Sequence, residues 1–173
     1  MGNHLGVIGC AAVLFISGCA AAPGPGSLTL IGNEGSVCIP SRDGMLVQLG
    51  GVMVKDVTAS IVPQGVTFSH KANVTIVGSY LLPMNGTQSL VGFDWVDDGW
   101  QATTPSGAII IGDEQVMLDG GQAYNLVILI EVIDADDPAE LSGIELLYNE
   151  AGIEHIESVG DEAVVPALGD TCF

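Results

Sequence analysis

The alternation of apolar and polar positions predicts a chain built almost entirely of β-strands. Short apolar or β-branched runs are separated by Gly, Pro, Asn and Asp, a pattern typical of a sandwich or barrel. We expect strands at 28–31, 36–39, 45–49, 52–62, 74–82, 89–95, 108–111, 115–118, 124–134, 144–148 and 153–159. The single helical signal is one turn beginning near Asp136-Asp137-Pro138, where Asp caps and Pro takes the first helical position.

Two segments carry most of the information about the fold. Residues 125–134 are apolar on both faces of the predicted strand for most of their length, so we expect this strand to lie in the middle of a sheet. Residues 149–152, Asn-Glu-Ala-Gly, predict a hairpin turn between the last two strands. Residues 28–173 are therefore predicted to form one all-β domain, an immunoglobulin-like antiparallel β-sandwich.

The first residues have the pattern of an export signal. Residues 5–16 are apolar or small, a run too short for a membrane-spanning helix of about 20 residues but long enough for the hydrophobic part of a signal peptide. The run ends in Ile16-Ser17-Gly18-Cys19, which resembles the lipobox of bacterial lipoproteins.

The lipobox resemblance implies a location and a domain organisation. Residues 1–18 would be a removed signal peptide, and Cys19 would become the lipid-bearing first residue. The Gly- and Pro-rich residues 19–27 would be a short tether. Acyl chains on Cys19 give stable anchoring without a spanning helix, so we expect attachment to the extracytoplasmic face of the cell membrane.

The charge balance limits the possible partners. The chain has 3 Lys+Arg against 21 Asp+Glu, for a net charge of -18. A surface this acidic repels phosphate backbones and anionic lipid head groups, so we expect no nucleic-acid binding. Contact with a membrane is therefore expected through covalent lipid.

Two further cysteines remain after Cys19 is used for lipid. Cys38 lies near the start of the predicted domain and Cys172 lies one residue from its end. In an exported protein such a pair most simply forms a disulfide; the alternative is two buried thiols. Closing a loop of about 135 residues would stabilise the fold by roughly 5 kcal/mol in the chain-entropy model.

Two acidic clusters are candidate calcium sites. Calcium takes six to eight oxygen ligands, commonly loop carboxylates and carbonyls. Residues 132–138 also faintly resemble the calcium-binding strand end of cadherins, without the Asn positions of that family. The alternative is a solvated, Asp-rich turn. The clusters are Asp94, Asp97 and Asp98, and Asp134, Asp136 and Asp137 with Glu140.

Trp95 and Trp100 form a second candidate ligand site, because two exposed tryptophans beside carboxylates suit a sugar or peptide; the alternative is packing in the core. The sequence has no nucleophile elbow, zinc-protease motif or phosphate loop, so we do not expect an enzyme. We expect a non-enzymatic binding or interaction module with an envelope protein as partner. The alternative is a calcium- or small-ligand-binding accessory protein that uses the Asp-rich loops.

Overall fold

The computed structural model describes residues 26–32, 35–42, 46–55, 57, 60–84, 92–96, 104–113, 116–118 and 120–172. Ten strands cover most of these residues, and no described residue is helical. The strands are β1 Thr29–Ile31, β2 Ser36–Cys38, β3 Leu46–Lys55, β4 Ile61–Ala72, β5 Val74–Pro83, β6 Gly92–Trp95, β7 Ile109–Ile110, β8 Tyr124–Val132, β9 Ala139–Glu150 and β10 Ile153–Val165.

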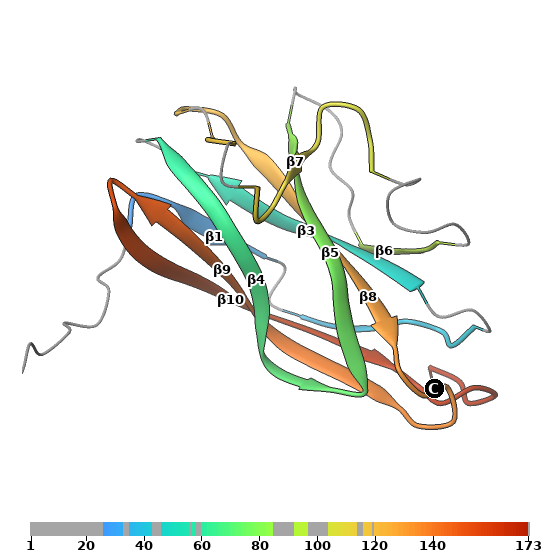
Figure 1. The fold of residues 1–173 in the computed structure, drawn as a ribbon. Helices are drawn as coiled ribbons and strands as arrows, with labels where there is room; N and C mark the ends of the chain where they lie inside the picture. Colours follow the sequence, from blue (N-terminus) through green and yellow to red (C-terminus); the bar gives the residue numbers. More distant parts are fainter. Residues whose placement is uncertain are drawn as a thin grey trace, which may run out of the picture.

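The strands form two sheets that pack face to face (Figure 1). The first sheet has the order β1-β3-β8-β5-β7, with β6 also pairing with β3, and the second has the order β2-β10-β9-β4. The paths β1-β3-β8-β5 and β4-β9-β10 reproduce the ABED and CFG sheets of the immunoglobulin constant-type fold. The predicted immunoglobulin-like sandwich is confirmed. Among the described strands every pair is antiparallel except β2 and β10, which are parallel.

The space between the sheets is filled by the main hydrophobic core. Strand β8 contributes Leu126, Ile128 and Ile130, and β9 faces them with Leu146 and Tyr148, all nearly inaccessible to solvent. The prediction that the strand over residues 125–134 is central is confirmed, because β8 lies between β3 and β5.

A second, smaller core covers the outer face of the first sheet. Tyr80, Val127 and Leu129 point away from the main core and are 0% exposed. Ala108 and Ile110, from the connection between β5 and β8, pack against them. The same connection pairs with β3 through β6 and with β5 through β7, so it reaches strands on both sides of β8.

Several predicted strand limits are wrong because β-bulges carry the strands through Gly and Pro residues that were expected to end them. The segments 45–49 and 52–62 were expected as two strands, but β3 runs through Gly50 and Gly51 by a bulge and ends at Lys55. Strand β4 then extends to Ala72, beyond Pro63, which is tolerated on an edge strand beside a bulge. Strand β10 likewise continues past Gly160.

Other predicted elements have mixed outcomes. The helical turn near Asp136 is wrong, because a non-helical turn leads directly into β9 at Ala139. In place of the strand predicted at 115–118, the described residues show only an isolated bridge between Leu118 and Ile61. The predicted hairpin turn is confirmed. Ala151 and Gly152 have φ angles of 52° and 86°, as a two-residue turn with both central residues left-handed requires.

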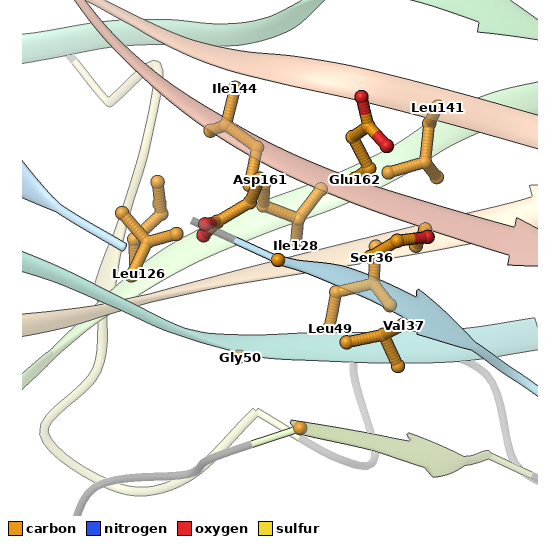
Figure 2. Close-up of a pocket in the computed structure, with 14 residues that line it drawn as sticks. Ser36, Val37, Leu49, Gly50, Leu126, Ile128, Leu141, Ile144, Asp161 and Glu162 are labelled. Atoms are coloured by element: carbon orange, nitrogen blue, oxygen red, sulfur yellow. The ribbon is translucent and has the colours of Figure 1, made fainter. Parts of the chain in front are cut away.

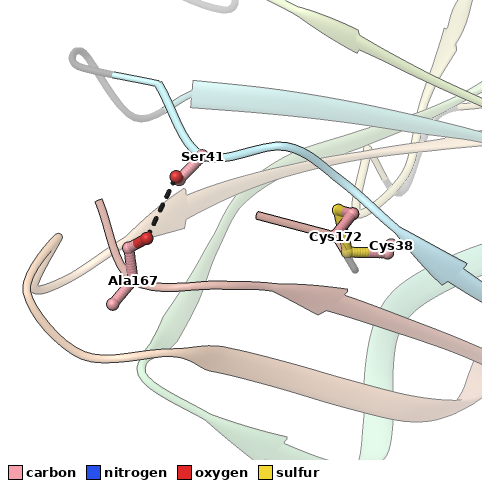
Figure 3. The surroundings of a disulfide bond; sticks show 4 residues. All are labelled: Cys38, Ser41, Ala167 and Cys172. Atoms are coloured by element: carbon pink, nitrogen blue, oxygen red, sulfur yellow. Dashed lines mark hydrogen bonds between the residues drawn. A yellow bond between two sulfur atoms is a disulfide. The ribbon is translucent and has the colours of Figure 1, made fainter. Parts of the chain in front are cut away.

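A disulfide joins Cys38, at the end of β2, to Cys172, in the tail beyond β10 (Figure 3). The predicted pairing is confirmed, with 134 residues separating the two cysteines. Near the disulfide, the Ser41 hydroxyl donates a hydrogen bond to the carbonyl of Ala167 at 3.1 Å. Within the described residues there is no helix long and apolar enough to cross a bilayer.

Candidate functional site

The two lateral sides of the sandwich, where the edges of the two sheets face each other, differ: one is closed by the chain and the other contains a cavity. On the side of β4, backbone N–H groups of Gly112 and Leu118 donate to the carbonyls of Pro63 and Ile61, so the β5–β8 connection seals the gap. On the opposite side, where the chain passes from β1 in one sheet to β2 in the other, a cavity of about 210 Å³ lies between the sheets (Figure 2).

The walls of this cavity are largely apolar and come from both sheets. Leu126 and Ile128 of β8 form one wall, and Leu141 and Ile144 of β9 form the other. Val37 of β2 is 41% exposed and also lines the cavity, so it marks the side open to solvent. The cavity is therefore an outward extension of the main core.

Two β-bulges border the cavity. One lies in β3 between Leu49 and Val52, and the other lies in β10 between Val159 and Glu162. A bulge inserts an extra residue, bends its strand and redirects a side chain. Space also remains because Gly35, Gly50 and Gly92 line the cavity without side chains. The two bulges and these three glycines thus shape a hollow in the core.

The β10 bulge places a carboxyl group at the cavity. Asp161 lines it, and its Oδ1 atom is buried without a hydrogen-bond partner. The carboxyl lies so close to Gly32 that a Cβ atom there would overlap it. Glu162 and Ser36 also line the cavity, and its described lining contains no Lys, Arg or His. A buried polar oxygen without a partner is costly, so it is the natural attachment point for a hydrogen-bond donor.

The predicted calcium loop is held together by one amide. Asn73, at φ 57°, donates from Nδ2 to the carbonyls of Asp134 and Asp137 at 2.7 and 2.8 Å, and its Oδ1 accepts the Asp134 N–H at 2.9 Å. The Asp134 carboxylate accepts the Asp136 N–H at 3.0 Å.

These contacts are those of a self-contained Asp-rich turn, and all three aspartates are exposed. Glu140 of the same predicted cluster lies 3.8 Å from His70, with both side chains more than half exposed. Nowhere in the described part of the chain do three or more His, Cys, Asp or Glu side chains gather as a metal site. Calcium binding at Asp134, Asp136 and Asp137 stays a prediction.

The other predicted site residues are separated or lie outside the described residues. Trp95 sits in β6 opposite Val47 of β3, is partly buried and packs against the main core, which favours its packing role. Asp94 is exposed on the same strand. Cys19, Asp97, Asp98 and Trp100 lie outside the described residues.

The chain enters the domain beside the β9–β10 hairpin. The Ser27 N–H donates to Glu150 Oε2 at 3.0 Å, and this hydrogen bond lowers the pKa of the Glu150 carboxyl, with nearby His155 adding to the effect. Tyr148 stacks on His155 with ring centroids 5.3 Å apart. Burial raises the pKa of the Tyr148 phenol, although the backbone of Leu28 opposes the rise. Ser27, the last residue of the predicted tether, is thus already attached to the sandwich.

Comparisons with known proteins do not assign a function. No protein-family model and no curated protein sequence matches the chain. Among solved structures, a PapD-like (ASH) domain of human CEP192 is similar at 6% identity and a TM-score of 0.40, covering 94% of this chain and all of that domain.

Two further structures are similar at lower TM-scores. The Vibrio cholerae VesB protease matches at 12% identity and 0.37, covering 79% of this chain, which spans about a third (31%) of the protease. The N-terminal domain of PorA matches at 10% identity and 0.26, covering 79% of this chain and 96% of that domain. TM-scores this low carry no information on what the chain does.

Proposed function

We propose that the chain is a non-enzymatic binding module held at the outer face of a cell membrane by lipid on Cys19. The anchoring part rests on the apolar segment 5–16 followed by Ile16-Ser17-Gly18-Cys19. A disulfide between Cys38 and Cys172 suits the oxidising compartment that such an anchor implies.

The proposal of a binding function rests on the apolar cavity between the sheets. Ligand sites are typically concave and mostly apolar, with a few polar groups that orient the ligand. The cavity has apolar walls from β8 and β9 and one carboxyl group, that of Asp161, without a partner. Apart from Ser36, Asp161 and Glu162, the described lining consists of apolar residues and glycine, a composition suited to holding a small ligand.

Anchoring is tested with two cysteine variants in a host that lipidates exported proteins. We expect the unaltered chain in the membrane fraction, with an intact mass that fits loss of residues 1–18 and gain of acyl groups. Cys19→Ala should lose the acyl mass and the association with lipid. Cys10→Ala is the matched control, because it removes a cysteine from the predicted leader, and it should behave as the unaltered chain. Lipid partitioning by Cys19→Ala would contradict the proposal.

Binding in the cavity is tested with a neutral apolar probe, 1-heptanol. We expect it to raise the melting temperature of the unaltered chain. Val37→Phe places a large aromatic side chain at the solvent-exposed side of the cavity and should reduce this effect. Ala163→Leu, which adds volume from the buried side, should do the same. Thr67→Phe, on the outer face of β4 away from the cavity, is the control and should retain the effect. Absence of any effect in the unaltered chain would contradict binding in the cavity.

A further inference from the structure

We infer that the cavity between the sheets binds a small amphiphilic cation, an amine whose ammonium group meets Asp161 while its apolar body fills the hollow. This inference rests on the proposed binding function and adds the chemical class of the ligand. It follows from three observations: the unpartnered oxygen, the charge of the surroundings and the size of the space.

The unpartnered oxygen calls for a donor. Asp161 lines the cavity beside the bulge in β10, and its Oδ1 is shielded from solvent and accepts no hydrogen bond. The carboxyl group must therefore turn slightly to present this oxygen to a ligand in the cavity. An ammonium group has three N–H donors, no acceptor and the charge opposite to that of a carboxylate, so it can donate to a carboxylate oxygen that lacks a partner. Such charge-assisted hydrogen bonds are stronger than neutral ones. An alcohol supplies one donor, and a carboxylate ligand supplies none.

The negative charge around the cavity also favours a positively charged ligand. Glu162, the next residue, also lines the cavity, and the described lining offers no cationic side chain to neutralise either acid. The whole chain carries a net charge of -18. An anionic ligand would place like charges together at low dielectric, whereas a cation is attracted toward the site. In Figure 2 the carboxyl groups of Asp161 and Glu162 point in different directions, so a single head group would meet Asp161 alone.

The composition of the walls excludes a metal ion as the natural occupant. Calcium needs six to eight oxygen ligands, but Leu126, Ile128, Leu141 and Ile144 present only carbon to the cavity. A ligand that satisfies Asp161 must therefore also cover apolar surface. The volume limits its size. A cavity of about 150 Å³ holds benzene, so about 210 Å³ accommodates roughly eight non-hydrogen atoms.

The test compares three probes of this size, heptylamine, 1-heptanol and heptanoate, by titration calorimetry on the full chain. We expect heptylamine to bind at least tenfold more tightly than 1-heptanol, and heptanoate to bind most weakly. Asp161→Asn keeps the shape of the side chain but removes its charge, so it should abolish the preference for the amine and leave 1-heptanol binding unchanged. Glu154→Gln removes one charge from an exposed position of β10 and should change neither affinity.

Each outcome separates the two levels of the proposal. Equal binding of amine and alcohol, unchanged in Asp161→Asn, would overturn the cationic ligand while leaving the cavity as a binding site. No binding of any probe would overturn both. If Asp161→Asn proves unfolded by circular dichroism, Val37→Phe provides the second variant. It should weaken the amine and the alcohol by similar factors, and an amine affinity unaffected by it would place the amine outside the cavity and overturn the inference.

Discussion

The outer faces of the two sheets have opposite surroundings and, for that reason, different patterns of apolar and polar residues. In the six-stranded sheet, Val127 and Leu129 point outward and are completely covered by the β5–β8 connection. In the four-stranded sheet, the outward positions of β9 and β10 carry Glu140, Glu145 and Glu154, with Ile156 51% exposed. The outward positions of a strand are therefore apolar where another segment covers that face and polar where the face meets water.

The difference shows why β8 has no polar alternation and β9 and β10 do. A strand with water on one side tolerates glutamate at every second position, whereas a strand between two cores does not. The outward glutamates of β9 and β10 thus stand where their charge stays in contact with water. Matched substitutions on the covered and the bare face should therefore differ in their cost.

The largest expected effect comes from truncating the covered face. Leu129→Ala removes a fully buried side chain and should lower the free energy of unfolding by about 2–5 kcal/mol. Ile156→Ala, the matched change on the bare face, should cost about 0.5 kcal/mol or less. Urea unfolding followed by circular dichroism measures both. Equal losses would mean that the second core does not contribute to stability.

Alkaline pH should destabilise the covered face through Tyr80. Burial raises the pKa of this phenol, so the unfolded chain ionises first, near pH 10, and stability falls as the pH rises from there through the folded-state pKa. The loss is at most about 1.4 kcal/mol per pH unit for one proton.

Tyr80→Phe removes this contribution and should cost little at pH 7, because the hydroxyl has no hydrogen-bond partner. Urea unfolding at pH 8 and pH 10.5 measures the difference. The proposal for Tyr80 fails if the two proteins lose stability in parallel between these pH values.

Acid should weaken the end of the bare sheet where the chain enters. The pKa of Glu150 is lowered by the Ser27 N–H, so this carboxylate stabilises the fold above its unfolded pKa and loses its contribution as the pH falls through the lower folded value. Glu150→Gln should therefore lose less stability than the unaltered chain between pH 7 and pH 3. Glu145→Gln is the control, and an identical acid response of the two variants would contradict a special role for Glu150.

The smallest effect is expected from charge on the bare face itself. Glu145, on the outer face of β9, is partly exposed. Glu145→Gln reduces repulsion among the glutamates of this face and should stabilise the fold by about 0.5 kcal/mol or less at low salt. In 1 M salt the gain should vanish, because the screening length falls to about 3 Å. Thermal unfolding at the two salt concentrations measures this, and a gain that persists in high salt would point to a cause other than charge.

The sequence predicted the fold class, the central position of β8, the disulfide and the turn at Ala151-Gly152. These features depend on local chemistry or on a two-sided apolar pattern, both of which are visible in one chain. It did not predict strand β4 or the full length of β10. Pro63, Gly65 and Gly160 are normally read as breaks, and only the pairing partner reveals that a bulge carries the strand through them.

The same error hid the candidate site. Gly50 and Asp161 lie at the bulges that border the cavity, yet in sequence they look like the ends of strands. The available signal was the pair of Gly-containing interruptions inside otherwise alternating segments, since glycine within a strand often marks a bulge. Which interruptions face each other depends on the sandwich topology and could not be read from one sequence.

The hydrogen bond between Ser27 and Glu150 has a consequence for how the domain would stand on a membrane. The chain enters at the hairpin end of β10, and Cys172 lies beyond the other end of this strand, about 40 Å away for 13 residues (Figure 1). Under lipid anchoring at Cys19, a leash of at most about 30 Å leads to the hairpin. The pole that carries Asn73 and the disulfide would then face outward, roughly 70 Å from the bilayer at full reach. A large partner would approach that pole first, whereas a small ligand would have access from the flank.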